Sequence, residues 1–363
     1  MDNVLLVVNS VYQLFTAIHM RTTILSQAEA ELILTDVTPG LPECRERLAG
    51  TGLFHRILLG ETARWCKQYA GAKGAALDAA FQDPPSTLHW LLSDELGRYT
   101  AVYFANFDPF ARLLACWFSQ ESCRFFCYED GFSAYVIDFL RGDRAPINRH
   151  PAGRKIQDKL AGMLLYEPRL ARRGDGVANL PLPKVRREDG RLKDVLNYVF
   201  AYRKPEDLEP FIFLEQSFRA EGIATNDIAL MELCRQAVGP GRFLVKPHPR
   251  NPENLPRQLG LTRKYPGNAP WELFLLNEAP MACTVLTVCS NGALTSRLVF
   301  GLETPVVMLY RLFTGKVLWK EDAALHQYLR QFQCQFAGRN YYVPKTPYEL
   351  TDILTYLGGK YGN

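Results

Sequence analysis

Short apolar runs alternate with helix-like stretches through the first half of this chain, and no other feature limits its fold as strongly. Runs of this length fit buried strands, and the stretches between them are long enough for helices. Such alternation is typical of βαβ units and predicts a parallel sheet. The expected strands are 4–8, 32–34, 57–59, 102–105 and 124–128, and the first expected helix covers 12–26.

A second α/β run follows a middle region that we expect to form loops and helices. With 363 residues the chain exceeds one ordinary domain. Thr225 and Asn226 are candidate caps for a helix that starts at 227. The expected strands are 211–214, 243–245, 284–288 and 306–309, and the expected helices are 227–238, 292–300 and 348–357.

The two runs together predict an α/β fold with two Rossmann-like domains facing a central cleft, the architecture called GT-B. We expect the N-terminal domain over 1–204, with a basic helical and loop segment at 141–204. The C-terminal domain would cover 205–345, and 346–363 would form a last helix that crosses back to the first domain.

Composition agrees with two packed domains in a reducing compartment. Hydrophobic residues make up 47% of the chain and charged residues 22%, which is enough apolar material for two cores. The nine cysteines are an odd number without CxxC or Cys/His ligand spacing, so we expect reduced thiols, no metal site and a cytoplasmic location. The apolar start at 4–8 is too short, and lacks the basic flank, for a signal peptide or membrane span.

The net charge of +4 is unevenly distributed, because residues 141–194 contain fourteen Lys or Arg against seven Asp or Glu. A basic segment of this kind is either a solvated face or a peripheral contact with the anionic inner face of the plasma membrane, and the sequence leaves both open. No RNP motif, helix-turn-helix signature or regular aromatic interleaving accompanies it, so we expect no nucleic-acid partner.

The strand at 243–245 runs directly into Lys246-Pro247-His248-Pro249-Arg250. Proline fixes φ, donates no hydrogen bond and makes the preceding residue extended, so this tip is stiff and presents an imidazole and two cations. In an open α/β sheet the carboxyl ends of the strands are where ligands bind. The plainer alternative is a stiff turn with a solvated histidine.

A second polar strand end follows 124–128, where Glu129 and Asp130 precede Gly131. Gly permits a tight turn, and one of the two carboxylates is a candidate general base. The alternative is an ordinary Asp-Gly turn. Other polar residues expected on this acceptor side are Ser10, Tyr12 and Gln13 after the first strand, where Ser10 is also a candidate helix cap, and Asn106 and Asp108 in the loop after 102–105.

Two further patterns suit a nucleotide. Ser290, Asn291 and Gly292 lead from a strand into a helix, where hydroxyl, amide and backbone N–H groups can bind a phosphate. Glu272, after Pro270 and Trp271, has a carboxylate suited to a ribose diol. Ordinary N-capping explains the first pattern equally well, and a helix-opening Pro with an acid in the first turn explains the second.

In this order, an acid-acid-Gly motif, a His-Pro motif and a Ser-containing turn resemble the bacterial sialyltransferases that use CMP-sialic acid. The start Asn9-Ser10-Val11-Tyr12-Gln13-Leu14 is similar to that of the lipooligosaccharide sialyltransferases, glycosyltransferase family 52, with the polysialyltransferases of family 38 as nearest relatives. The resemblance implies a metal-independent, inverting transfer of sialic acid to a galactose-like hydroxyl of a lipooligosaccharide or other surface glycan. No cofactor is expected, and a homodimer is compatible with it.

The resemblance also implies roles for individual residues. His248 would contact the CMP phosphate as general acid or electrostatic aid, with Lys246, Pro249 and Arg250 beside it. The donor's phosphate would lie at Ser290, Asn291 and Gly292, and its ribose at Glu272. The general base would be Asp130 or Glu129, with Asp227 as the rival because some family members use an aspartate shortly before the His-Pro motif. Ser290-Asn291 departs from the family's Ser/Thr pair, so the identity of the donor is less secure.

Two alternatives remain at this point. The same fold could use CMP-Kdo or a UDP-hexose as donor, or the chain could be a non-catalytic GT-B-like protein that binds glycans. Neither a GxGxxG nor a GxxxxGK[ST] loop nor a GxSxG elbow occurs, so hydride transfer, ATP chemistry and a serine hydrolase have no support in the sequence.

Overall fold

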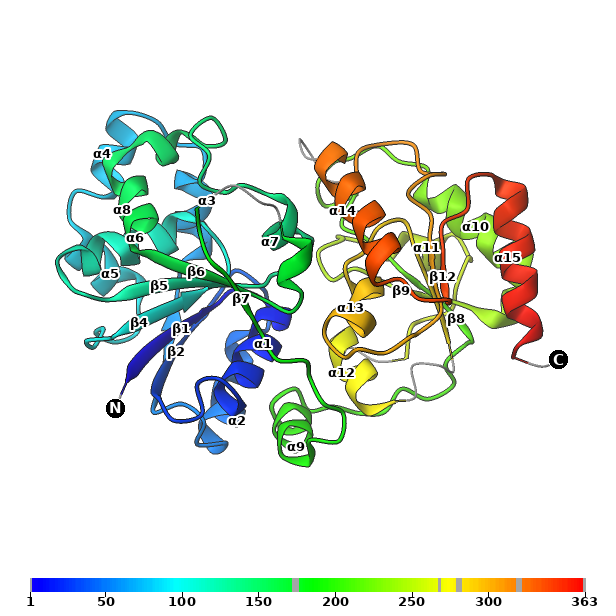
Figure 1. Ribbon diagram of the computed structural model, residues 1–363, viewed down its shortest axis with the longest axis horizontal. Helices are drawn as coiled ribbons and strands as arrows, with labels where there is room; N and C mark the ends of the chain where they lie inside the picture. The colour runs from blue at the N-terminus through cyan, green and yellow to red at the C-terminus, as the bar shows by residue number, and fades with distance from the viewer. Residues whose placement is uncertain (1, 172–175, 267–268, 279–282, 318–321, 362–363) are drawn as a thin grey trace. The chain divides into compact units, whose positions relative to one another are not determined.

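The computed structural model describes residues 2–171, 176–266, 269–278, 283–317 and 322–361. The chain divides into two compact units, Met1–Ala201 and Tyr202–Asn363 (Figure 1). Each unit is built on one sheet whose neighbouring strands are all parallel. In the described part of the chain, none of the helices is long and apolar enough to span a membrane.

The first unit contains a seven-stranded sheet in the order β3-β2-β1-β4-β5-β6-β7. Its strands are β1 (Asn3–Val8), β2 (Glu29–Thr35), β3 (Arg56–Gly60), β4 (Ala101–Phe104), β5 (Arg124–Tyr128), β6 (Leu160–Leu165) and β7 (Asn179–Pro181). All five strands expected in the first half of the chain are present. The strand order reverses between β1 and β4, so polar residues that follow these strands share the edge where such sheets bind ligands.

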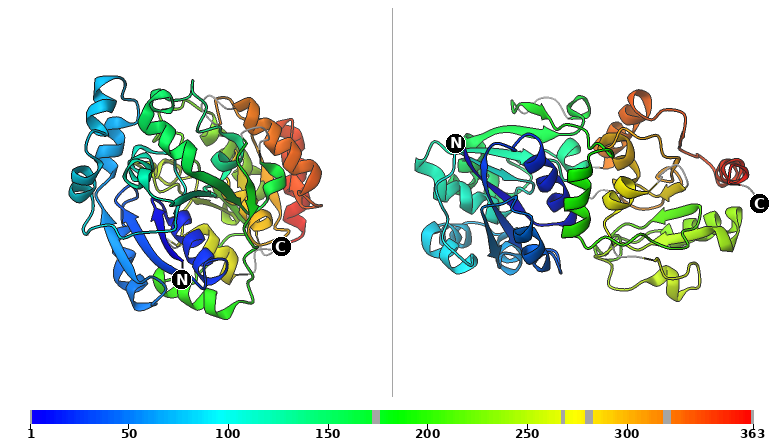
Figure 2. Two further views of the ribbon diagram at one scale, coloured as in Figure 1. Left: turned by 60° about the vertical axis from the view of Figure 1, so that its left-hand side comes forward. Right: turned by 90° about the horizontal axis from the view of Figure 1, so that it is seen from below.

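Helices cover both faces of this sheet (Figures 1 and 2). On one face lie α1 (Val11–Thr22), α2 (Arg45–Gly50) and α9 (Gly190–Val199), and on the other lie α5 (Pro84–Leu91), α6 (Pro109–Trp117) and α8 (Pro151–Lys159). The remaining helices of the unit are α3 (Ala63–Tyr69), α4 (Ala75–Ala80) and α7 (Phe132–Val136). Ser10 and Asp108 cap α1 and α6 by accepting the backbone N–H groups of Gln13 and Ala111.

Strands β6 and β7 correct the expectation that the middle region contains only loops and helices. β6 has the sequence LAGMLL, whose Ala and Gly are poor strand formers. Gly162 lets β7 pair closely with β6, because a Cβ at this position would come within 2.9 Å of Leu180 on β7. The strand is therefore stabilised by pairing with its neighbours rather than by local propensity.

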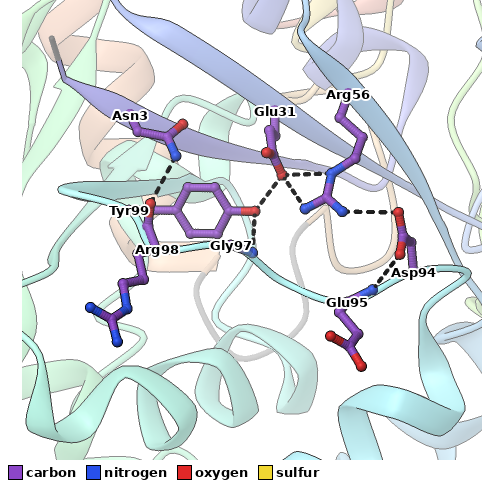
Figure 3. Close-up of polar contacts among 8 residues, drawn as sticks. All are labelled: Asn3, Glu31, Arg56, Asp94, Glu95, Gly97, Arg98 and Tyr99. Carbon is purple, nitrogen blue, oxygen red and sulfur yellow. Dashed lines mark hydrogen bonds and ion pairs between the residues drawn. The ribbon is translucent and has the colours of Figure 1, made fainter.

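At the amino ends of its strands, the first sheet carries an ionic cluster (Figure 3). The Glu31 carboxylate on β2 accepts hydrogen bonds from Arg56 Nη2 at 2.8 Å and from the Tyr99 hydroxyl. Arg56 also donates to Asp94 at 2.9 Å. This cluster, defined by Glu31, Arg56, Asp94 and Tyr99, joins β2 and β3 to the segment that leads into β4.

The second unit contains a five-stranded sheet in the order β12-β11-β10-β8-β9. Its strands are β8 (Phe211–Leu214), β9 (Phe243–Lys246), β10 (Thr284–Thr287), β11 (Val306–Met308) and β12 (Tyr341–Tyr342), and its helices are α10 (Asp227–Val238), α11 (Leu255–Gln258), α12 (Trp271–Asn277), α13 (Gly292–Leu298), α14 (Asp322–Gln335) and α15 (Pro347–Gly359). All four expected strands are present, whereas α11, α14 and β12 were not foreseen. In Figure 1, α10 and α15 lie on one face of this sheet and α12 and α13 on the other.

Within the second unit, α15 packs on α10, and the Gly358 carbonyl accepts a hydrogen bond from Arg242 at 2.8 Å. One candidate helix cap differs from the structure. Asn226 precedes α10 without capping it through its side chain. Its amide instead donates to the Leu312 carbonyl and accepts from the Thr314 N–H, which ties the start of α10 to the loop after β11.

Candidate functional site

In the first unit, Glu129 is fully buried at the end of β5 and accepts three hydrogen bonds. Tyr12 donates to one carboxylate oxygen at 3.1 Å, and the Tyr166 backbone N–H donates to the other at 2.9 Å. The Tyr135 hydroxyl also donates to this second oxygen. Burial raises the pKa of Glu129 to about 7, although the three donors oppose the rise. The carboxyl group therefore changes its charge near neutral pH.

A chain of amides extends from Asp130, the next residue, to the end of β1. The Asn106 amide donates to the Asp130 carboxylate at 2.9 Å. Its own carbonyl oxygen accepts from Gln13 at 2.7 Å and from Asn9 at 3.0 Å. The side-chain oxygen of Asn9 in turn accepts a hydrogen bond from the Thr35 hydroxyl at 2.8 Å. Residues that follow β1, β4 and β5 thus hold Asp130, which is half-buried, in one orientation.

Asp108 is a second carboxylate at this edge. It accepts from the Ala111 backbone N–H at 2.8 Å as the cap of α6, and from the Asn9 amide at 3.0 Å. Burial of its carboxylate raises its pKa to about 6, against these hydrogen bonds. The geometry makes Asp108 part of the scaffold that orients Asn9.

The first sheet edge brings together the residues expected on the acceptor side. They are Ser10, Tyr12, Gln13, Asn106, Asp108, Glu129, Asp130 and Gly131. Gly131 has φ +72°, a left-handed conformation that favours glycine after Asp130. Sequence reasoning missed Tyr135 and Tyr166 as partners, because nothing local marked these tyrosines.

In the second unit, His248 is held by its backbone and by one ring nitrogen. The backbone N–H of His248 donates to a Glu215 oxygen at 2.9 Å, and its Nδ1 accepts from the Arg250 N–H at 3.2 Å. Because Nδ1 accepts, the neutral ring carries its proton on Nε2. Burial lowers the pKa of His248 to about 4, helped by Arg250 and Lys246 and opposed by Glu221. At neutral pH the ring is therefore an uncharged Nε2–H donor.

Two residues before His248, the Lys246 ammonium group donates to the Ala269 carbonyl at 3.2 Å and lies 4.7 Å from the centre of the Tyr265 ring. Burial of this group lowers the pKa of Lys246 to about 8, and the charge of Glu272 opposes the fall. Burial likewise raises the pKa of Glu272 in the first turn of α12, and Lys246 opposes that rise. Each of these two charges thus favours the charged form of the other beside the His-Pro tip.

The turn at Ser290 is joined to the same helix. The Trp271 indole N–H donates to the Gly292 carbonyl at 2.9 Å, and the Gly292 N–H donates to the Ser290 hydroxyl at 3.3 Å. A Cβ on Gly292 would lie 3.1 Å from Leu214 and 3.3 Å from Trp271, so a side chain would crowd the turn. The Asn291 amide oxygen is buried without a hydrogen-bond partner among the described residues.

Asp227 is buried at the start of α10 and accepts a hydrogen bond from Thr225. Its other oxygen lies 3.7 Å from Arg219, which also pairs with Glu215. Asp227 is therefore linked to the His248 backbone through two intervening side chains.

The second sheet edge thus brings together Lys246, His248, Glu272 and the turn from Ser290 to Gly292, with Pro249 and Arg250 exposed at the tip. Sequence reasoning missed Glu215, Gln216 and Arg219, which follow β8. An acid directly after a buried strand is the signal that marked Glu129, and the same signal was present at Glu215. In the described ranges, no group of three or more His, Cys, Asp or Glu side chains is placed to hold a metal ion.

The sequence matches no protein-family model and no curated protein. Solved structures do match over nearly the whole chain. Arabidopsis thaliana UGT89C1 complexed with UDP is 10% identical with a TM-score of 0.55, covering 98% of this chain and 91% of that one. UDP-GlcNAc 2-epimerase from Methanocaldococcus jannaschii is 9% identical with a TM-score of 0.53, covering 99% and 94%. LpCGTa in complex with UDP is 11% identical with a TM-score of 0.51, covering 99% and 90%. These likenesses, with two parallel α/β sheets, establish a fold of the GT-B type.

Proposed function

We propose that this chain is an inverting glycosyltransferase that transfers a sugar from a nucleotide donor to a glycan or glycolipid hydroxyl, with CMP-sialic acid as the leading donor. One observation carries the proposal. A histidine with its proton on Nε2 stands at a strand end of a GT-B fold, in the same unit as a lysine–glutamate pair and a Ser-Asn-Gly turn. Groups of this kind suit a sugar nucleotide.

The second unit would bind the donor. His248 Nε2–H would donate a hydrogen bond to a phosphate oxygen, and Lys246 would add positive charge. The low pKa of His248 favours hydrogen-bond donation over proton transfer in the unliganded protein. An anionic phosphate beside the ring would raise that pKa and allow partial proton transfer as the nucleotide leaves. Glu272 would accept the ribose hydroxyls, and the turn at Ser290 would complete the phosphate site.

The first unit would supply the general base. Asp130 is favoured over Glu129 because all the hydrogen bonds to Glu129 come from donors that fix it in a buried position. Asp227 is the rival, and the observation in its favour is a buried oxygen that accepts no hydrogen bond from the described residues and lies 3.7 Å from Arg219. A well-placed base contributes about 10²- to 10⁴-fold in rate.

The transfer would be one displacement. The acceptor oxygen bonds to the anomeric carbon while the bond from that carbon to the phosphate oxygen breaks. The bonding electrons leave with the nucleotide, where His248 and Lys246 stabilise the phosphate charge. The acceptor proton passes to the Asp130 carboxylate, and the configuration at the anomeric carbon inverts. In this scheme the Lys246 charge and the His248 N–H stabilise the leaving phosphate, so we propose that the reaction needs no metal ion.

A UDP-sugar is the second candidate donor. Its support is that solved structures of similar fold are described as complexes with UDP or UDP-L-rhamnose. The departure of Ser290-Asn291 from the sialyltransferase pattern points the same way. CMP-Kdo is compatible with the same phosphate site.

A lipid-linked acceptor would bring the chain to the cytoplasmic face of a membrane. The exposed cations of the basic segment, Arg154 and Lys155 on α8 among them, would then contact anionic lipid. Flotation with phosphatidylglycerol vesicles should capture the wild-type chain and release it when both residues are changed to Gln. If the two proteins float to the same extent, Arg154 and Lys155 do not contact the lipid, and the segment is a solvated face.

A donor screen tests the proposed function. Release of CMP from CMP-sialic acid and CMP-Kdo, and of UDP from UDP-hexoses, would be measured with galactose-terminated glycans as acceptors. His248→Ala should lose activity by at least about tenfold. His89→Ala, a change at an exposed histidine on α5, is the matched control and should behave as wild type. If His248→Ala keeps full turnover, the reaction occurs at another site. If none of the donors releases its nucleotide, the chain is not a transferase for these donors.

A further inference from the structure

We infer that Glu215 is a positioning residue for His248: its buried carboxylate fixes the His-Pro tip, and the loop that it begins, residues 215–221, holds the tip and the Ser290 turn together. This inference rests on the proposed function for its catalytic meaning. Its structural content stands on hydrogen bonds within the second unit alone.

Glu215 follows β8 directly, and its side chain is fully buried. One oxygen accepts the His248 backbone N–H at 2.9 Å, and the other accepts from Arg219. A buried carboxylate is costly unless it is paired and hydrogen-bonded, and here both oxygens are satisfied. One oxygen of the carboxylate thus holds the His248 main chain against β8, and the other pairs with Arg219.

The prolines explain why this one bond matters. Pro247 and Pro249 have no N–H group, so the His248 N–H is the only backbone donor of the three residues. The flanking rings also stiffen the tip. Because the segment is stiff and has one backbone donor, the position of that donor also sets the position of the imidazole.

Other bonds between the same two segments keep the tip in register. The Glu215 N–H donates to the Lys246 carbonyl at 3.1 Å, and the Asn251 amide donates to the Gln216 carbonyl at 3.0 Å. Arg250 donates to Ser217 at 2.9 Å. These contacts lie around the part-buried Glu215–His248 hydrogen bond.

Gln216 extends the same loop to the predicted phosphate turn. Its side-chain oxygen accepts the Cys289 N–H at 2.6 Å, one residue before Ser290. On the other side, Arg219 joins Glu215 to Asp227. The 215–221 loop therefore contacts the His-Pro tip, the residue before Ser290 and Asp227, although no sequence motif marks it.

The test compares Glu215→Ala and Glu215→Gln with the control Glu232→Gln, which removes a partly exposed carboxylate of α10 that is paired with Arg235. Nitrogen NMR of the unliganded full chain reports the tautomer and the pKa of His248, assigned with His248→Ala. Wild type should show the Nε2–H form with a pKa far below the ordinary 6.5. Glu215→Ala should move this pKa upward toward 6.5 as the ring becomes solvated.

The sign of that change is diagnostic. Besides Glu215, the charged groups facing His248 are Lys246, Arg250, Glu221 and, behind Glu215, Arg219. Removal of a negative charge alone would lower the pKa of the imidazole. A rise therefore requires the ring to leave its position, either into water or away from Lys246 and Arg250. Glu215→Gln keeps an acceptor for the His248 N–H and should shift the pKa less than Glu215→Ala.

In the nucleotide-release assay, Glu215→Ala should lower kcat by about tenfold or more, Glu215→Gln should retain more activity, and Glu232→Gln should match wild type. If Glu215→Ala does not fold, the comparison rests on Glu215→Gln and Arg219→Met. A folded variant whose His248 tautomer and pKa equal those of wild type would overturn the inference. The NMR measurement needs no turnover. Failure of every donor would therefore reject the proposed function, whereas the inference about Glu215 would still be decided by the tautomer and pKa of His248.

Discussion

Replacing Glu129 by Gln should abolish a specific pH dependence of stability in the first unit. In the folded chain burial raises the pKa of Glu129 from 4.5 to about 7. The folded state therefore keeps a proton that the unfolded state releases between these pH values, so the free energy of unfolding falls as the pH rises through this window. At about 1.4 kcal/mol per pH unit, the loss amounts to about 3 kcal/mol and is complete above pH 7.

The glutamine variant has no proton to release and should lack this slope. Its carbonyl oxygen can still accept from Tyr135 and the Tyr166 N–H, and the Tyr12 hydroxyl can turn to accept from the amide. Urea unfolding of the full chain at pH 5 and pH 8, followed by circular dichroism, measures the effect. The stability of wild type relative to Glu129→Gln should fall by about 3 kcal/mol between the two pH values.

A variant at an exposed carboxylate, Glu121→Gln, is the matched control and should leave the wild-type slope in place. A difference between wild type and Glu129→Gln that stays constant from pH 5 to pH 8 would refute the reasoning. It would mean that the hydrogen bonds to Glu129 outweigh its burial.

Three further predictions concern the reaction and the packing. Asp130→Asn should lower kcat by about 10²- to 10⁴-fold and Asp227→Asn by less, and the reverse order would transfer the base to Asp227. Glu272→Gln should weaken CMP binding, measured by calorimetry, more than it lowers kcat, whereas unchanged affinity would remove Glu272 from the ribose site. Gly153→Ala should destabilise the chain by about 3 kcal/mol or more, because its Cβ would lie 1.7 Å from the Ile147 carbonyl oxygen. Gly190→Ala, where a Cβ meets nothing within 4 Å, should leave the urea midpoint close to that of wild type, and equal effects of the two changes would contradict the packing at Gly153.

Sequence patterns predicted the strands that are made by apolar runs and missed those that are made by pairing. β1 and β8 are continuous hydrophobic segments that any α/β sheet would bury. β6 depends on a glycine that lets β7 approach, and β12 has only two residues. Neither fact is visible in a local window of sequence.

The candidate site divides in the same way. Residues after predicted strands, such as Glu129 and His248, could be found because parallel strands end at one sheet edge. Their partners could not be found where they come from distant segments: Tyr166 reaches Glu129 over 37 positions, and Glu215 reaches His248 over 33. Hydrogen bonds of this range depend on the tertiary fold, which a motif does not encode.

The ionic cluster of Glu31, Arg56, Asp94 and Tyr99 has a consequence for how the first unit can change (Figure 3). Its hydrogen bonds connect β2 and β3 to the segment before β4 at the amino ends of the strands, whereas Asp130 lies at the opposite edge of the sheet. Substitutions in the loops at the opposite edge, where Asp130 lies, therefore leave the hydrogen bonds of this cluster in place. A directed-evolution library confined to those loops would vary the surface at that edge, while the four residues of the ionic cluster would continue to hold the strands together.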